Sequence, residues 1–185
     1  VVVFPEGETF FEGVFDVPPG CDLRLSSGKA VVAARDTVPD ATEEFGPEAL
    51  PRLRERLADA VDGIGQDAAL CLSGGLDSSS VAAAWARRGK PRCFIYGAPG
   101  SEDRESARET AEALGLRPVL PEFGETAGLD ELRRMLRVLE IPTHIPGAPL
   151  PQFRLMESMA RSGVRTVVSG QGGDELFCGY PWHFP

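Results

Sequence analysis

The spacing of apolar residues changes along the chain near residue 45. In residues 1–35, short apolar runs are separated by the turn-forming stretches EGE, VPPG and SSGK, a pattern typical of a β-rich segment. Beyond residue 45, apolar residues first recur at helical spacing at Leu50, Leu53, Leu57 and Val61. This spacing predicts a helix, and Pro51 fits its first turn because a backbone N–H there needs no partner within the helix.

The remaining sequence alternates between short apolar runs and helical stripes. Strands are expected in the run that ends at Leu72 and at 92–97 and 164–170. Helices are expected at 78–88, 104–114 and 129–139, and from a Pro-rich loop at 142–151 to about 161. Such alternation predicts an α/β fold with a doubly wound, mostly parallel sheet. Ligands of these sheets bind beyond the carboxyl ends of the strands, here near Leu72, Tyr96 and Val168.

Composition narrows the class of protein. Hydrophobic residues make up 42% and charged residues 25%, as in globular proteins, and no apolar run approaches the ~20 residues needed to cross a bilayer. The net charge of −9 argues against a nucleic-acid partner. The cysteines form neither a CxxC pair nor a zinc-like group, which indicates reduced thiols of a cytoplasmic protein. They are Cys21, Cys71, Cys93 and Cys178.

The segment CLSGGLDSSS, residues 71–80, lies between a predicted strand and a predicted helix. Gly74 and Gly75 let the backbone turn tightly, and the first amides of the helix point outward toward an anion. Hydroxyl groups are available from Ser73, Ser78 and Ser79. Asp77 suits a phosphate site when a divalent cation lies between the two anions. The lysine of a Walker A loop is absent, so we predict another kind of phosphate loop. The alternative is a plain turn with an ordinary N-cap, which is disfavoured because Asp77 and the hydroxyl groups stand together at a strand–helix junction.

A second glycine-rich stretch, SGQGGDELFCGY at 169–180, follows the third predicted strand. Its glycines again free the backbone, and Asp174 adds a carboxylate able to meet the same cation from the opposite side. The alternative is an ordinary loop in which Asp174 and Glu175 cap a helix. Two such loops in one short chain favour a shared ligand site.

Other residues that suggest chemistry are better explained by structural roles. Trp85 stands at a helical apolar position and is expected in the core. His144 and His183 stand apart from other potential ligands, so solvated or packing roles are favoured over metal binding. The acidic cluster at 101–105 favours a helix start, with an indirect role at a metal as the alternative.

The two stretches LSGGLDSS and SGQGGDELFCGY together resemble the paired motifs of the asparagine synthetase family, which belongs to the N-type ATP pyrophosphatases. GVFDVPPGCDLRL is similar to the last strands of that family's N-terminal glutaminase-type domain. The resemblance implies a β-rich remnant of that domain at 1–40, followed at 41–185 by the first part of an ATP pyrophosphatase domain of the adenine nucleotide α-hydrolase type. Without an initiator methionine or the family's helical C-terminal part and its catalytic lysine, we expect a fragment.

The resemblance also implies a chemistry. Members of the family split ATP between its α and β phosphates, form an acyl-adenylate of a carboxylate and release AMP when an amine attacks. The implied pyrophosphate loop consists of Ser73, Gly74, Gly75, Asp77, Ser78 and Ser79. Asp77 and Asp174 would hold Mg²⁺, while the backbone around Tyr96, Ser169 and Gly170 would hold the adenosine of ATP. The implied partners are a small or peptide carboxylate and an amine or ammonia from a glutaminase domain, and the oligomeric state stays open, a homodimer included.

The sequence departs from the family pattern in ways that leave the product open. Gln171 stands where asparagine-forming members commonly carry glutamate, and as a catalytic residue its amide orients a nucleophile but exchanges no proton. Between Glu140 and Gln152 there is no cation for an amino-acid carboxylate. Cys178 replaces a usual glycine. The candidate functions are asparagine formation, intramolecular amide closure as in β-lactam synthetases and lasso-peptide macrolactam cyclases, and nucleotide binding without turnover, which the paired aspartates disfavour.

Overall fold

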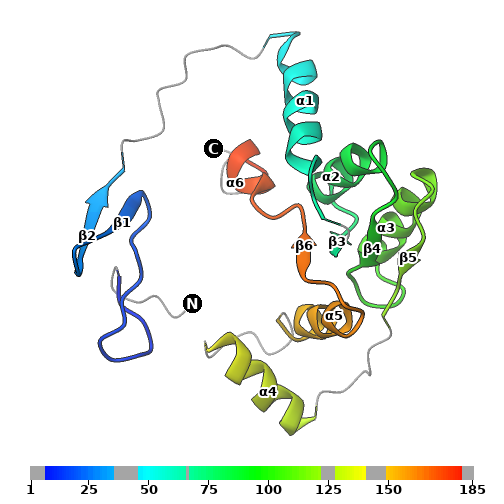
Figure 1. Ribbon diagram of the computed structural model, residues 1–185. Coiled ribbons are helices and arrows are strands. Elements are labelled where there is room, and N and C mark those ends of the chain that lie inside the picture. Colours follow the sequence, from blue (N-terminus) through cyan, green and yellow to red (C-terminus); the bar gives the residue numbers. More distant parts are fainter. Residues whose placement is uncertain (1–6, 36–45, 66, 122–127, 141–148, 181–185) are drawn as a thin grey trace.

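A parallel sheet with strand order β5-β4-β3-β6 forms the centre of the fold (Figure 1). The computed structural model describes residues 7–35, 46–65, 67–121, 128–140 and 149–180. The strands of this sheet are β3 (Ala68–Leu72), β4 (Arg92–Ile95), β5 (Pro118–Val119) and β6 (Thr166–Val168). The helices are α1 (Ala49–Val61), α2 (Leu76–Ala86), α3 (Glu102–Ala113), α4 (Leu129–Leu139), α5 (Pro149–Arg161) and α6 (Gly173–Phe177). The predicted α/β fold with a parallel sheet is confirmed.

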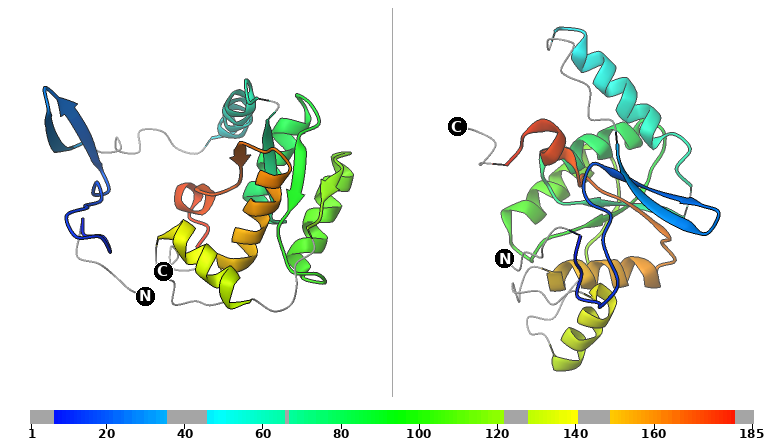
Figure 2. Two further views of the ribbon diagram at one scale, coloured as in Figure 1. Left: turned by 60° about the horizontal axis from the view of Figure 1, so that its bottom comes forward. Right: turned by 90° about the vertical axis from the view of Figure 1, so that its left-hand side faces the viewer.

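Helices cover both faces of the sheet, as Figure 2 shows. Successive side chains of a strand point to opposite faces, so Leu70 and Leu72 of β3 join a buried cluster with α2 and α3. Ala69, between them in the sequence, packs with Phe94 against α5 on the other face. Trp85 of α2 is buried in the first cluster, as expected. The sheet is therefore doubly wound.

The direction of chain progression reverses between β3 and β6. From β3 the chain proceeds through β4 to the edge strand β5, and it then returns past both to place β6 on the free side of β3. The crossover that leaves β3 through α2 and the crossover that reaches β6 through α5 lie on opposite faces of the sheet. At such a reversal a crevice opens beyond the carboxyl ends of the strands. Residues 73–80 and 169–180 both lie at this point, because they follow β3 and β6 directly.

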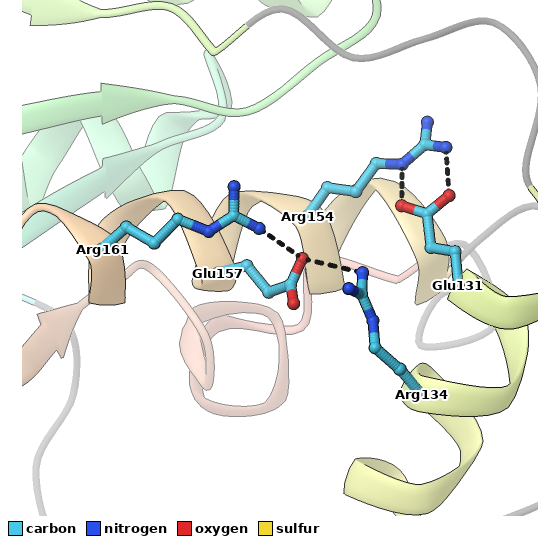
Figure 3. A network of polar contacts seen from close by, with 5 residues as sticks. All are labelled: Glu131, Arg134, Arg154, Glu157 and Arg161. Atoms are coloured by element: carbon cyan, nitrogen blue, oxygen red, sulfur yellow. Dashed lines mark hydrogen bonds and ion pairs between the residues drawn. The ribbon is translucent and has the colours of Figure 1, made fainter.

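Helix α4 is attached to α5 by ion pairs and by a small apolar cluster (Figure 3). Arg154 of α5 donates two hydrogen bonds of 2.6 Å to the carboxylate of Glu131 in α4. Glu157 pairs with Arg134 of α4 at 3.5 Å and with Arg161 of its own helix at 3.0 Å. The hydrogen bonds from Arg154 hold the pKa of Glu131 below its ordinary value. This network fixes α4 along the side of α5.

The N-terminal segment contains an antiparallel hairpin of β1 (Cys21–Ser26) and β2 (Lys29–Ala34). Ser27 and Gly28 both have positive φ, as a two-residue hairpin turn requires. The β-rich character predicted for residues 1–35 is therefore seen in this hairpin. Its membership of a glutaminase-like domain stays a prediction.

Several predicted boundaries were wrong. Helices α2 and α3 each begin two residues before the predicted start, and α5 begins at Pro149, inside the expected Pro-rich loop. Strand β5 was not predicted, because its two residues are too few to show a period. His144 and His183 lie outside the described residues. None of the helices in the described part has the length and apolar character needed to cross a membrane.

Candidate functional site

A cavity of about 660 Å³ lies beyond the carboxyl ends of β3 and β6. Its size falls in the usual range for small-molecule sites, about 300–1,000 Å³. Both glycine-rich stretches line it, together with two residues of α5, and within the described residues no lysine or arginine does so. The predicted site residues in its lining are Ser73, Gly75, Asp77, Ser78, Tyr96, Ser169, Gly170, Gln171 and Asp174. Gly74 and Ser79, which were assigned to the same loop, are not in the lining.

The first loop is held by hydrogen bonds among its own residues. The Ser78 hydroxyl accepts from the Ser73 N–H at 3.2 Å, lies 2.9 Å from the Ser73 hydroxyl and donates to the Gly75 carbonyl at 3.2 Å. Ser78 is also the one buried polar residue of the described core, at 3% exposure. Its hydroxyl therefore shapes the loop, whereas Ser73 is more accessible at the cavity wall.

The loop rests on the start of α3. Gly74 has φ +87°, and a Cβ atom there would overlap the carbonyl oxygen of Asp103. The Ser106 hydroxyl of the same helix donates to the Gly74 carbonyl at 3.2 Å. Asp103 thus contacts the loop through its backbone. Ser101 is the N-cap of α3, and its hydroxyl oxygen accepts a hydrogen bond from the Arg104 N–H at 3.3 Å. The acidic cluster at 101–105 is mainly a helix start, as favoured from the sequence.

The second loop closes over Asp77. A Cβ atom at Gly170 would lie 2.9 Å from the Cβ of Asp77, and one at Gly173 would overlap the Asp77 carboxyl group. Glycine at both positions therefore allows the backbone of the second loop to enclose the Asp77 side chain. Gly173 directly precedes Asp174, so the two predicted metal carboxylates come from loops in contact with each other.

Acidic groups gather at one side of the cavity. The Tyr180 hydroxyl donates to the Glu175 carboxylate at 2.8 Å. That hydrogen bond, with the nearby negative charges of Glu175, Asp174 and Asp77, raises the pKa of the Tyr180 hydroxyl. Within the described residues, no group of three His, Cys, Asp or Glu side chains forms a protein-only metal site. Two carboxylates beside the predicted phosphate loop fit Mg²⁺, which usually takes one or two protein carboxylates plus phosphate oxygens.

The other side of the cavity is largely apolar. Cys71, Tyr96 and Met156 line it from the core face that β3 and β4 present to α5. Burial raises the pKa of the Cys71 thiol to about 11, so this group is a neutral part of the wall. Gln152 and Met156 belong to successive turns of α5, and sequence reasoning missed both. Only the packing of α5 on the sheet brings them to the site.

Comparison with known proteins assigns the family. The sequence profile described as Asparagine synthase matches residues 52–185, which contain the whole parallel sheet and both loops. The chain belongs to the asparagine synthase family. This confirms the resemblance drawn from the two motifs. In the setting of this family, the cavity described above is the candidate active site of the synthase domain.

Relatives within the asparagine synthase family are about one third identical in sequence to this chain over the matched residues. The glutamine-hydrolyzing asparagine synthetase of Asparagus officinalis is 37% identical over 123 residues, covering 59% of this chain and 20% of its own length. Asparagine synthetase B of Escherichia coli strain K12 is 30% identical over 167 residues, covering 80% of this chain and 28% of its own length. The matched part of this chain thus corresponds to between a fifth and a third of the length of these relatives. An NH3-dependent NAD synthetase structure from Campylobacter jejuni, in complex with nitrate, aligns with a TM-score of 0.46 and 22% identity, over 70% of this chain and 60% of that one.

Proposed function

We propose that the complete protein forms an amide bond by asparagine synthetase-type chemistry. ATP is bound across the two loops, with its triphosphate at the glycine-rich side and its adenosine at the apolar side near Tyr96, Ser169 and Gly170. An oxygen of the carboxylate substrate attacks the α-phosphorus, the bond to the β-phosphate bridging oxygen breaks, and pyrophosphate leaves. An amine then attacks the acyl carbon, loses a proton and displaces AMP.

The enclosure of Asp77 by the second loop is the observation that carries this proposal. It joins a lysine-free phosphate loop to a second carboxylate, Asp174, in one cavity. Asp77 and Asp174 would hold Mg²⁺, which supplies charge neutralisation at the departing phosphates. The amides of Gly75 and of the first turn of α2 would bind the pyrophosphate, since a helix start favours negative charge.

Gln171 lines the cavity and stands three residues before Asp174 in the second glycine-rich stretch. Its own N–H donates to the Ser169 hydroxyl at 3.3 Å. An amide side chain both donates and accepts hydrogen bonds but does not titrate. We therefore assign Gln171 a role in orienting the carboxylate or the amine, with no transfer of a proton.

The carboxylate is a small amino acid or part of a peptide, and ammonia or another amine is the nucleophile. Residues 1–40 would be the end of a glutaminase-like domain able to supply ammonia. The free thiols of the chain fit the reducing cytoplasm.

The proposal is tested by isotope exchange between ATP and pyrophosphate on the complete protein, with candidate carboxylates added one at a time. Exchange is expected only when the right carboxylate is present, and AMP and pyrophosphate are the expected products in the full reaction. Formation of ADP alone would refute it. The exchange rate with free aspartate and with larger carboxylates is compared in the unsubstituted protein and in Gln171→Glu. Exchange with aspartate in the unsubstituted protein assigns asparagine formation.

A further inference from the structure

The loop between β3 and α2 is tied to α3 by one side chain that lies outside the cavity. The Ser106 hydroxyl donates to the Gly74 carbonyl at 3.2 Å. Ser106 is half-buried and does not line the cavity. Any influence of Ser106 on a ligand therefore passes through the peptide group that it contacts.

That peptide group joins the two glycines of the loop. The Gly74–Gly75 peptide bond is trans, so the Gly74 carbonyl and the Gly75 N–H point in opposite directions in one plane. When Ser106 holds the carbonyl toward α3, the N–H is turned away from α3. Gly75 lines the cavity and Gly74 does not, which agrees with an N–H turned toward the cavity.

The Gly75 N–H is available to a ligand. Among the described residues, no backbone or side-chain group accepts a hydrogen bond from it, whereas the Gly75 carbonyl accepts from Ser79 N–H and from the Ser78 hydroxyl. A glycine pair without side chains can rotate this peptide plane at low cost. The hydrogen bond from Ser106 restrains this rotation.

We infer that Ser106 is a positioning residue, which orients the Gly75 amide toward the pyrophosphate portion of the bound nucleotide. This inference rests on the proposed function, since it names one donor to the pyrophosphate. A preorganised donor costs no reorganisation when the anion arrives. Loss of the Ser106 hydroxyl lets the peptide plane rotate and should weaken binding of the phosphate part of the ligand alone.

The experiment measures binding of Mg²⁺·pyrophosphate and of AMP to the complete protein by calorimetry. Ser106→Ala is expected to weaken pyrophosphate binding about five- to tenfold, the loss typical of one ordinary hydrogen bond, and to leave AMP binding unchanged. Ser106→Thr, which keeps the hydroxyl, should restore it. Ser80→Ala is the matched control, since Ser80 is a half-buried serine of α2 outside the cavity lining.

The outcomes separate this inference from the function on which it rests. Unchanged pyrophosphate binding in Ser106→Ala overturns the positioning role alone. Equal weakening of pyrophosphate and AMP, or equal weakening in the alanine and threonine variants, assigns the effect to packing and also overturns it. Absence of pyrophosphate binding by the unsubstituted protein overturns the proposed function and this inference together.

Discussion

Asp77 lies in a space that exists because two glycines of another loop lack side chains. Gly170 and Gly173 face it from the stretch after β6. Alanine at Gly173 would not strain the backbone, because its φ is not positive, but the added Cβ atom would displace the Asp77 carboxyl. The second glycine loop is thus needed for the placement of a carboxylate that belongs to the first.

Asp77→Asn and Asp174→Asn are each expected to leave the fold intact, because both side chains stand in the first turn of a helix, in α2 and α6, and neither is buried in the core. Each substitution removes a charged oxygen ligand, so Mg²⁺-dependent pyrophosphate binding should fall by ten-fold or more, roughly the loss of one charged ligand interaction. Calorimetric titration with and without Mg²⁺ measures this loss. Folded variants with unchanged affinity would disprove the metal assignment.

At this scale the sequence predicted residue types better than roles. The positions of both loops follow from glycines, aspartates and hydroxyls that stand directly after apolar runs. Ser78 was predicted to face a ligand, and that role stays a prediction beside the loop-shaping hydrogen bonds of its hydroxyl. Gln152 and Met156 were not predicted because nothing local distinguishes a cavity-lining turn of α5 from any other amphipathic turn.

One of the ion pairs between α4 and α5, Arg154 with Glu131, is largely shielded from solvent. The side chains of Arg154 and Glu131 are 13% and 20% exposed, whereas Asp130 and Arg133 on α4 pair at 95% and 63% exposure. Solvent screens the exposed pair strongly and the other much less. Arg154 does not line the cavity and pairs with Glu131 instead.

Glu131→Gln is therefore expected to lower the free energy of unfolding by roughly 1–2 kcal/mol at neutral pH, and Asp130→Asn to change it little. Because Arg154 lowers the pKa of Glu131 in the folded state, the stabilisation is present above the ordinary carboxyl pKa and is lost as pH falls through the lowered value. The difference in the free energy of unfolding between Glu131→Gln and the unsubstituted protein should therefore vanish in acid. Denaturant titrations across pH measure it, and a cost that persists in acid would contradict the ion-pair explanation.

The elements themselves were largely predictable. Strong periodicity located the helices around 50–61 and 129–139 almost to the residue. Helix starts were less well placed, since Leu76 and Glu102 carry no apolar periodicity of their own. Strand order could not be derived from the chain, because the position of β6 beside β3 depends on packing of α5 across the sheet.

For the molecule as a whole, one ligand is expected to join residues 73–80 to residues 169–180, which lie about 90 residues apart in the sequence. A ligand that contacts both loops binds only when β3 and β6 are paired, so it should stabilise the folded state. Pyrophosphate with Mg²⁺ at about 100 times its Kd should raise the Tm of this domain by about 5–10 °C. Differential scanning calorimetry measures the shift, and EDTA should abolish it. A shift that survives EDTA would contradict a metal-dependent site.

The place of β6 at the sheet edge also has a consequence for synthesis on the ribosome. The segment from β3 to β5 emerges first, and its neighbouring strands pair through short-range crossovers. One edge of β3, the strand that contains the fully buried Leu70, stays unpaired until β6 (Thr166–Val168) has been synthesised. An apolar strand with an open edge is a template for pairing with another chain. Nascent chains that stop between these points are therefore expected to depend on chaperones, and the arrival of β6 both protects the sheet and completes the site.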